Sequence, residues 1–277
     1  MKKFKLGLQL FSVRDALNED FEGTLKKVKE MGYDYVEFAG YYDRSAEEIK
    51  ALLDKYGLTA ISAHQDYPYF FEGDMQKKID FLKTLGIKYV AQPWLNPDKR
   101  KGGENYEKAI ADMKLLADKL KENGIQMLYH NHDFEFEIYD GKFQLEWYLE
   151  DLEGKVLPEI DTFWVHYSGY DPKEYILKYK NELPVLHLKD FECANLENKP
   201  IFTFSDGKKA EMKKLTREEQ GFHFKPIGDG LQNIPDILKS AEVCGTQYLI
   251  VEQDLWFEID QMEAAKKSAE YLNSLDF

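Results

Sequence analysis

The 277-residue chain is long enough for one large α/β domain, and its 43% content of hydrophobic residues excludes a disordered protein. A formal net charge of −14 argues against a nucleic-acid partner, because phosphate contacts need clustered Lys and Arg. The two isolated cysteines, Cys193 and Cys244, argue against a disulfide framework or a thiolate metal site and fit a reducing compartment.

The first segment, MKKFKLGLQLFSVRDAL, has a basic start, but Gln9 and Arg14 interrupt its apolar stretch and no signal-cleavage pattern follows. Elsewhere, no run approaches the ~18 apolar residues of a membrane helix. We therefore expect a cytoplasmic protein with no membrane partner.

Amphipathic helical patterns alternate with short apolar runs, and a glycine often joins them, as in LKKVKEMGYDYVEF and IDFLKTLGIKYVAQPW. Glycine just past a helix is the favoured left-handed C-cap. Strands that alternate with helices of this length indicate parallel βαβ units. The predicted strands, in chain order, lie around Leu6–Leu10, Tyr33–Phe38, Thr59–Ala63, Tyr89–Ala91, Gln126–Tyr129, Val156–Ile160, Val185–Leu188 and Tyr248–Val251.

Eight such units predict a single (β/α)8 or TIM barrel over residues 1–277. A doubly wound open sheet is the alternative, but it usually has a glycine-rich turn after its first strand, which LQLFSVRDAL lacks.

Each predicted strand ends on a polar side chain, and in a barrel these ends meet at one mouth, where active sites of this fold lie. The eight residues are Gln9, Glu37, His64, Gln92, His130, Asp161, His187 and Glu252. Most follow one another at the spacing of one βα unit, whereas the interval from His187 to Glu252 is much longer. This interval predicts an insertion at about residues 192–224, between strand seven and its helix, that covers the mouth.

The last four of these residues, His130, Asp161, His187 and Glu252, end consecutive predicted strands. Two imidazoles and two carboxylates form a plausible metal shell that suits Mn, Co, Zn or Fe(II) better than Ca. We predict one divalent ion here, with Mn favoured and Co, Zn or Mg as alternatives. The competing interpretation is that each residue has only a structural role.

Several motifs spread from residue 5 to about residue 272 resemble the xylose isomerase-like TIM barrels of the sugar phosphate isomerase/epimerase group, in the AP endonuclease family 2 superfamily. These motifs are LGLQLFSVRDAL, YHNHDFEF, EIDTFWV, VLHLKDF, PIGDGLQNIPDIL and YLIVEQD. The resemblance implies a divalent metal held by Glu, Asp, His and Glu from strands five to eight. Asp161, His187 and Glu252 match this set, but His130 stands where the relatives have the strand-five glutamate.

This departure bears on the mechanism that the resemblance implies, in which two glutamates exchange a proton on opposite faces of a metal-bound ketose. Without the first glutamate, Glu135 or Glu137 would have to fold back, or a histidine would have to act as the base. We predict His132 as that base, because it follows His130 by two residues, with Glu252 as both ligand and acid/base.

Lys189 shares a strand face with His187 and is predicted to reach the mouth, where it would stabilise an enolate; the alternative is a salt bridge to Asp161 or Glu159. Trp94, Trp164 and Trp256 also follow strand ends, and aromatic faces suit sugar stacking. The substrate-binding residues are predicted to be Gln9, Glu37, His64, Gln92, Trp94 and Trp164. Gly228 and Gly230, before a helix expected to start near Asn233, leave a substrate phosphate undecided.

The leading functional hypothesis is a metal-dependent sugar isomerase or epimerase that transfers a proton α to a carbonyl. A lyase that eliminates from a 3-keto-glycoside on the same metal site is the first alternative, and a non-catalytic sugar-binding protein is the second. An endonuclease IV-like role is disfavoured by the charge of −14. The expected partner is a small sugar or sugar derivative; the particular sugar, its phosphorylation and the oligomeric state are not predicted.

Overall fold

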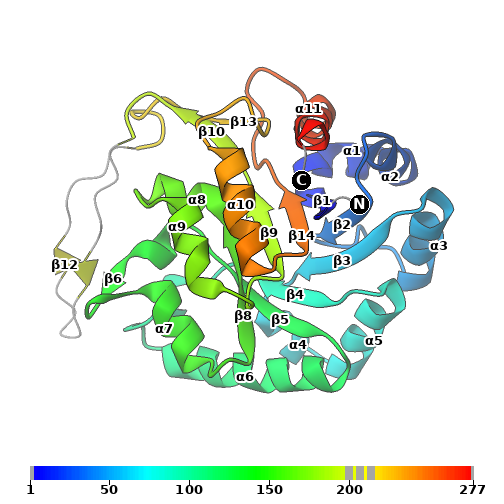
Figure 1. Ribbon diagram of the computed structural model, residues 1–277. Coiled ribbons are helices and arrows are strands. Elements are labelled where there is room, and N and C mark those ends of the chain that lie inside the picture. Colours follow the sequence, from blue (N-terminus) through cyan, green and yellow to red (C-terminus); the bar gives the residue numbers. More distant parts are fainter. Residues whose placement is uncertain (1–2, 197–201, 204–208, 211–215, 276–277) are drawn as a thin grey trace.

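A closed barrel of eight parallel strands dominates the computed structural model, which describes residues 3–196, 202–203, 209–210 and 216–275 (Figure 1). The strands are β1 (Lys5–Gln9), β2 (Tyr35–Phe38), β3 (Thr59–His64), β4 (Tyr89–Gln92), β5 (Gln126–His130), β8 (Val156–Asp161), β9 (Val185–Leu188) and β14 (Tyr248–Val251). They pair in chain order, and β14 closes the barrel against β1. The predicted (β/α)8 barrel is confirmed.

Helices surround the barrel on its outside (Figure 1). The longer ones are α2 (Phe21–Glu30), α3 (Ala46–Tyr56), α5 (Met75–Leu85), α6 (Tyr106–Glu122), α7 (Gln144–Asp151), α10 (Ile234–Cys244) and α11 (Gln261–Ser274). Shorter ones are α1 (Arg14–Glu19), α4 (Tyr67–Phe71), α8 (Thr162–Tyr167) and α9 (Pro172–Ile176). The 3-10 turns are η1 (Leu10–Val13), η2 (Pro97–Lys99), η3 (Phe134–Phe136) and η4 (Leu177–Tyr179). Among the helices that the structure describes, none combines the length and the apolar run needed to cross a membrane.

Glycine ends several of these helices, as the sequence pattern predicts. Gly57, Gly86 and Gly245 cap α3, α5 and α10 with φ of 69°, 80° and 76°, the left-handed region that glycine enters without steric cost. Each cap reverses the chain into the next barrel strand.

The lower part of the barrel interior is apolar. Its buried side chains are Ile61, Ala91, Leu128, Val185, Tyr248 and Ile250. Gly7 also faces this layer, and a Cβ there would lie 2.6 Å from Ile250 Cδ1, so the close packing requires glycine. The imidazole and carboxylate side chains of the barrel interior lie above this layer, toward the carboxyl ends of the strands.

The predicted insertion begins with β10 (Asp190–Cys193) and ends near β13 (Phe222–Lys225), which pair antiparallel. An aromatic cluster packs this pair against α8; its members are Phe163, Trp164, Tyr167, Phe191, Phe222 and Phe224. Between them, β11 (Phe202–Thr203) and β12 (Lys209–Ala210) extend the small sheet of β6 (Ile138–Tyr139) and β7 (Lys142–Phe143). Residues 197–201, 204–208 and 211–215 of the insertion lie outside the described residues, so its cover over the mouth stays a prediction.

Candidate active site

The four predicted metal ligands meet at the carboxyl ends of β5, β8, β9 and β14. One ligand atom from each of His130, Asp161, His187 and Glu252 lies within 4.8 Å of the others. His130 Nε2 is 3.8 Å from Asp161 Oδ2, and His187 Nδ1 is 3.1 Å from Glu252 Oε2. We call these four residues the mouth group.

The ammonium of Lys189 lies among the carboxylates of the mouth group. Its Nζ is 3.1 Å from Asp161 Oδ2, 2.9 Å from Glu252 Oε2 and 3.1 Å from Asp254 Oδ1. Lys189 is 1% exposed, so this is a buried charge cluster. The predicted alternative of a salt bridge to Asp161 is therefore present, and it coexists with the position at the mouth.

A cavity of about 340 Å³ opens directly above this cluster. Its wall combines titratable and aromatic side chains: Phe11, Ala39, His64, Pro93, Trp94, His130, His132, Lys189, Glu252 and Asp254. Trp94 is 45% exposed there, so its ring face is available to a ligand. The volume is of the size that small-molecule sites have.

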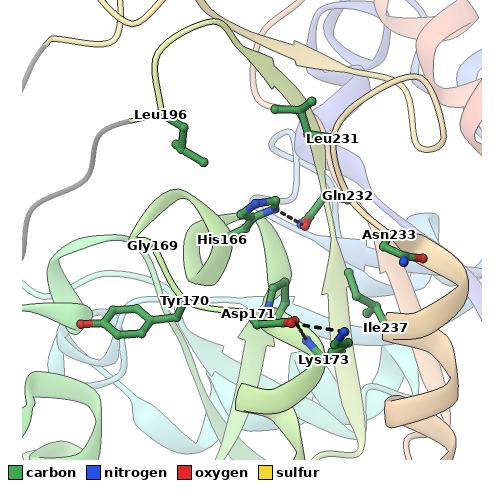
Figure 2. A pocket seen from close by; sticks show the side chains of 11 residues that line it. His166, Gly169, Tyr170, Asp171, Lys173, Leu196, Leu231, Gln232, Asn233 and Ile237 are labelled. Carbon is green, nitrogen blue, oxygen red and sulfur yellow. Dashed lines mark hydrogen bonds and ion pairs between the residues drawn. The ribbon is translucent and has the colours of Figure 1, made fainter.

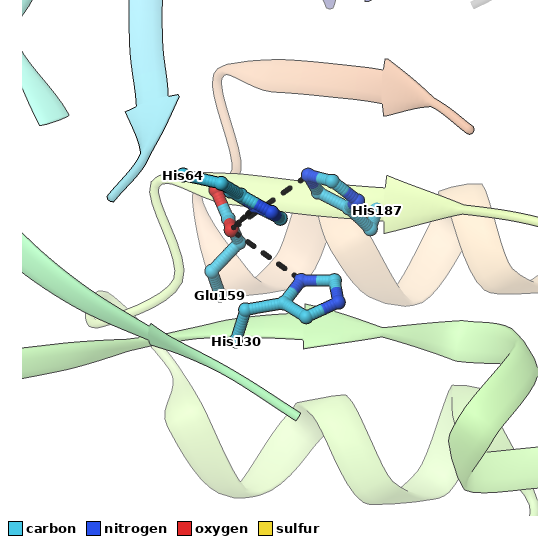
Figure 3. A group of neighbouring side chains, drawn as sticks. All are labelled: His64, His130, Glu159 and His187. Atoms are coloured by element: carbon cyan, nitrogen blue, oxygen red, sulfur yellow. Dashed lines mark hydrogen bonds and ion pairs between the residues drawn. The ribbon is translucent and has the colours of Figure 1, made fainter. Parts of the chain in front are cut away.

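A second group, His64, His130, Glu159 and His187, lies deeper in the barrel (Figure 3). Glu159 Oε2 is 2.8 Å from His64 Nε2, 3.5 Å from His130 Nδ1 and 3.7 Å from His187 Nε2. We call these four residues the deep group. It shares His130 and His187 with the mouth group.

Glu37 closes the deep group from the side of β2. Its Oε1 is 2.7 Å from His187 Nε2 and 3.0 Å from His64 Nε2, and it also accepts a hydrogen bond from Gln9 Nε2 at 2.7 Å. The Ser62 hydroxyl donates to its other oxygen. Burial opposes ionisation, but His64 and His187 hold the pKa of Glu37 well below its usual value.

The buried acids of the two groups have different pKa values. Burial raises the pKa of Asp161 to about 6, although Lys189 acts against this shift. Burial and the nearby Glu37 carboxylate raise the pKa of Glu159 to about 7. Glu252 is also buried, but Lys189 and His187 lower its pKa, so its carboxylate stays ionised.

The pKa values of the histidines also differ: two are raised and two are lowered. Burial opposes protonation of His64 and His187, but Glu37 and Glu159 raise the pKa of His64 to about 10 and raise that of His187 as well. Burial holds the pKa of His130 and of His132 well below the usual value, and neighbouring cationic groups act in the same direction. His132 is therefore a neutral imidazole beside the cavity.

His132 lies beyond the end of β5, because the strand stops at His130. Its ring contacts Trp94 and Trp164 at centroid distances of 5.1 and 5.2 Å, and its buried Nδ1 has no hydrogen-bond partner among the described residues. Trp164 is 3% exposed and packs beneath His132. It therefore supports the cavity instead of lining it as a predicted substrate-binding residue.

Three other predicted substrate-binding residues are buried and bonded within the protein. Gln9 donates to Glu37 and accepts from the amide of Phe11. Gln92 accepts from the Tyr67 amide at 2.7 Å and donates to the Trp94 carbonyl at 2.6 Å. Gln9, Glu37 and Gln92 therefore support the site through hydrogen bonds within the protein and do not line the cavity. His64 and Trp94 do line it.

Glu135, one candidate for the strand-five ligand, turns away from both groups. Its carboxylate accepts hydrogen bonds from Tyr129 Oη at 2.8 Å and from the His132 amide at 2.7 Å. Glu137 belongs to neither group of possible ligands among the described residues. On strand five, His130 is the side chain that reaches the mouth group.

The Gly228–Gly230 loop does not offer free amides to a phosphate. Asp190 accepts hydrogen bonds from the amides of Gly228, Gly230 and Gln232 at 2.9, 3.1 and 3.0 Å, and also from that of Phe191 at 2.9 Å. An internal carboxylate therefore takes the place that an anion would occupy. The helix does start where expected, with Asn233 as the N-cap of α10.

A separate cavity of about 410 Å³ lies outside the barrel, between the α8–α9 turn and the start of α10 (Figure 2). Its polar side chains are paired with one another: His166 Nδ1 lies 2.9 Å from Gln232 Oε1, and Asp171 pairs with Lys173 at 3.4 Å. At the mouth, by contrast, four possible metal ligands lie within 4.8 Å of one another.

Sequence reasoning missed Asp254 and weighed Glu159 only as a partner of Lys189. Glu159 could have been found, because it precedes Asp161 by two residues and shares its strand face. Asp254 follows the end of β14, where irregular backbone gives no periodic signal.

Together, these observations define a (β/α)8 barrel with a cluster of possible metal ligands at the carboxyl ends of its strands. The chain belongs to the xylose isomerase-like TIM barrel family, whose model matches residues 25–275. This is the family that the motifs predict.

Individual relatives are more distant. An inosose dehydratase of Lacticaseibacillus casei is 23% identical over an alignment of 278 residues, and the alignment covers 92% of this chain and 89% of the relative. A crystal structure of a sugar phosphate isomerase/epimerase from Parabacteroides distasonis has a TM-score of 0.73 at 24% identity and covers 99% of this chain and 95% of its own. The structure of the IOLI protein, with a bound zinc atom, has a TM-score of 0.64 at 17% identity over 97% of this chain and 96% of its own.

Proposed function

We propose that this protein is a divalent-metal-dependent sugar isomerase or epimerase that moves a proton at the carbon next to a carbonyl. The observation that carries the proposal is the mouth group, in which two imidazoles and two carboxylates lie within 4.8 Å of one another beneath a cavity of about 340 Å³. The names of the structural relatives support sugar chemistry.

The residues of the mouth group fit a divalent ion. Asp161 Oδ2 is buried and has no hydrogen-bond partner of normal geometry among the described residues. Buried polar groups are usually satisfied, so such atoms point to a missing ligand. A divalent ion held by His130, Asp161, His187 and Glu252 would supply Lewis-acid stabilisation of negative charge on a substrate oxygen.

The chain's own groups can move the proton. Glu252 stays ionised beside Lys189, so its carboxylate can accept the α-proton, and its position at the cavity wall gives access to substrate. Lys189 holds that carboxylate at 2.9 Å and can donate a hydrogen bond to a developing oxyanion. His132 also lines the cavity, and its neutral imidazole is suited to carry a proton to or from another face of the substrate.

Elimination is the second candidate function, and one observation favours it. Glu135 is bonded to Tyr129 and lies outside both ligand groups, so no strand-five carboxylate is available for the two-glutamate exchange. A β-elimination needs only one base for the α-proton and one acid for the leaving hydroxyl, which Glu252 and Lys189 could provide. The inosose dehydratase relative carries out a reaction of this type by its name.

Incubation in D₂O with Mn(II) and a panel of keto sugars, aldo sugars and cyclic polyol ketones tests these functions. Epimerisation or isomerisation by proton transfer puts deuterium on the α-carbon of the recovered sugar or its isomer. Elimination gives an unsaturated product and no labelled epimer. Ligand-induced thermal stabilisation without either product across the panel would indicate a sugar-binding protein and would refute the enzymatic proposal.

A further inference from the structure

The two imidazoles shared by the mouth group and the deep group present opposite ring nitrogens to them. His130 turns Nδ1 toward Glu159 at 3.5 Å and Nε2 toward Asp161 at 3.8 Å. His187 turns Nε2 toward Glu159 at 3.7 Å and Nδ1 toward Glu252 at 3.1 Å. Either group can therefore be completed without rotating a ring.

The deep group has the composition of a metal site in its own right. Three imidazole nitrogens surround one carboxylate oxygen, and the ligand atoms lie within 4.8 Å of one another (Figure 3). His130 Nδ1, which lies 3.5 Å from Glu159 Oε2, is buried and has no hydrogen-bond partner among the described residues, and His130 is 1% exposed. Unpartnered, fully buried polar atoms that face a cluster of nitrogen and oxygen ligands indicate a cation position.

The two positions exclude one another because a neutral imidazole has a single lone pair. An ion in the deep group uses the lone pairs of His130 Nδ1 and His187 Nε2, which places hydrogens on the opposite nitrogens. Those hydrogens then face Asp161 and Glu252, so the mouth group loses both of its nitrogen ligands. One chain therefore holds one ion of this kind at a time.

Ligand chemistry separates the ions that each group prefers. The deep group offers three nitrogens and one oxygen, a composition that zinc favours. The mouth group offers two nitrogens and two oxygens beside an open cavity, which suits Mn(II) with room for further oxygen ligands. Lys189 also contacts Asp161 and Glu252 and competes with a cation at the mouth, whereas it makes no ion pair with Glu159 among those described.

We propose that the deep group of His64, His130, Glu159 and His187 is a second, zinc-selective cation position that excludes the ion at the mouth. Zinc bound there removes His130 and His187 from the mouth and so inhibits the protein. The inhibitory consequence rests on the proposed function, in which the mouth ion supports catalysis. The proposal of a cation position in the deep group does not rest on the proposed function.

Competition between the two ions tests the proposal without an activity assay. Protein loaded with Mn(II) is titrated with Zn(II), and released Mn(II) is followed by the six-line electron paramagnetic resonance signal of the free ion. We expect one zinc bound per manganese released. His64→Asn and Glu159→Gln alter only the deep group, so they should raise the zinc concentration needed by about 10- to 100-fold, the loss that even an outer partner of a ligand causes.

Asp161→Asn provides the opposite case, because it alters only the mouth group: it should weaken Mn(II) binding and leave Zn(II) binding intact. His223→Asn, at an exposed histidine paired with Glu192, is the matched control and should behave as the wild type. Thermal unfolding of each variant verifies that it is folded. If wild type and both deep variants need equal zinc, or if two ions bind at once, the proposal is overturned.

Anomalous diffraction at the zinc edge gives a test that needs no variant. A zinc peak among His64, Glu159 and the shared imidazoles supports the proposal, and a peak beside Asp161 and Glu252 overturns it. Failure of the proposed function looks different: wild type would bind no Mn(II), while zinc binding would still be lost in His64→Asn and kept in Asp161→Asn.

Discussion

Two polar regions at the carboxyl-terminal end of the barrel contain buried acids but satisfy them in opposite ways. At the mouth, the carboxylates of Asp161 and Glu252 and that of the neighbouring Asp254 share the ammonium of Lys189. In the Asp190 loop, one carboxylate accepts hydrogen bonds from four backbone amides, three of them at Gly228, Gly230 and Gln232. The first region has an excess of hydrogen-bond acceptors beside a cavity, whereas the carboxylate of the second region is satisfied by backbone donors.

The difference separates a reactive site from a structural one. A carboxylate that backbone donors satisfy stabilises the fold and has no remaining need for a ligand. A cluster with surplus negative charge and unpartnered ring nitrogens is costly to bury, and such a cluster is maintained where it binds or reacts. Variants of the two regions should therefore affect different measurements.

Glu252→Gln should have the largest effect, and on activity. The substitution keeps the size of the side chain and removes the basic carboxylate, and a lost general base typically costs about 10²–10⁴-fold in rate. Turnover is measured together with Mn(II) content, so that metal loss is separated from loss of the base. Glu258→Gln, at a side chain that is 80% exposed, is the control.

Normal turnover by metal-loaded Glu252→Gln would show that Glu252 is not the base. The inferred contrast between a reactive region and a structural region would then have no support from activity.

Lys189→Met should have the largest effect on stability. It leaves the buried carboxylates of Asp161 and Glu252 and the partly exposed one of Asp254 without the Lys189 ammonium, and breaking a buried ion pair from one side typically costs about 3–5 kcal/mol. Urea unfolding measures the change. Mn(II) should restore part of the loss, because an ion at the mouth replaces the missing positive charge.

Lys155→Met is the matched control, because Lys155 pairs with Asp118 at a surface where both side chains are partly exposed. An exposed pair contributes about 0–1 kcal/mol. If the two lysine variants unfold at the same urea concentration, the charge cluster at the mouth is not what we infer.

Glu135 is a third kind of buried acid, whose carboxylate accepts hydrogen bonds from the Tyr129 hydroxyl and the His132 amide. Burial raises its pKa to about 8 from the usual 4.5, although both hydrogen bonds act against the shift. The folded state therefore keeps this proton up to about pH 8, whereas the unfolded chain releases it near pH 4.5. The stability that this group contributes is complete below pH 4.5 and is lost as the pH rises to 8.

Glu135→Gln should remove this decline, because the amide stays neutral at every pH. The expected change is on the order of a few kcal/mol across the window, since one pKa unit corresponds to about 1.4 kcal/mol. Free energies of unfolding between pH 5 and pH 8 measure it, with Glu72→Gln at an exposed position as control. A variant that keeps the wild-type slope would contradict this account of Glu135.

Much of the fold and the mouth group could be predicted because both rest on periodic signals. Glycines such as Gly57 and Gly86 end helices, and alternation along β9 places His187 and Lys189 on one inward face. The carboxyl ends of parallel barrel strands then meet at one mouth.

The sequence did not predict side-chain positions where strand register or irregular backbone decides the direction in which a side chain points. Tyr89 and Ala91 face the barrel interior, so Gln92 faces outward to α4, and a polar residue at a strand end does not by itself reveal its face. A 3-10 turn carries Glu135 away from the mouth after β5 ends. The glycines of the Gly228–Gly230 loop left a substrate phosphate undecided, because the carboxylate of Asp190 that fills the loop is distant along the chain.

Asp190→Asn should have the smallest effect of these variants. It contrasts with the mouth variants because it should lower stability without changing Mn(II) binding. The new amide group must direct one NH₂ toward amides that donated to the carboxylate, so at least one buried donor loses its acceptor, at a cost of about 1–3 kcal/mol. Urea unfolding should show this loss, while Mn(II) affinity stays within about twofold of wild type because no mouth ligand changes. Asp74→Asn is the control: Asp74 caps α5 through the Lys77 amide at 3.2 Å, and Asn caps helices as well as Asp does. If Asp190→Asn instead keeps its stability and loses Mn(II), the Asp190 loop belongs to the site, and the division between a satisfied and an unsatisfied region is wrong.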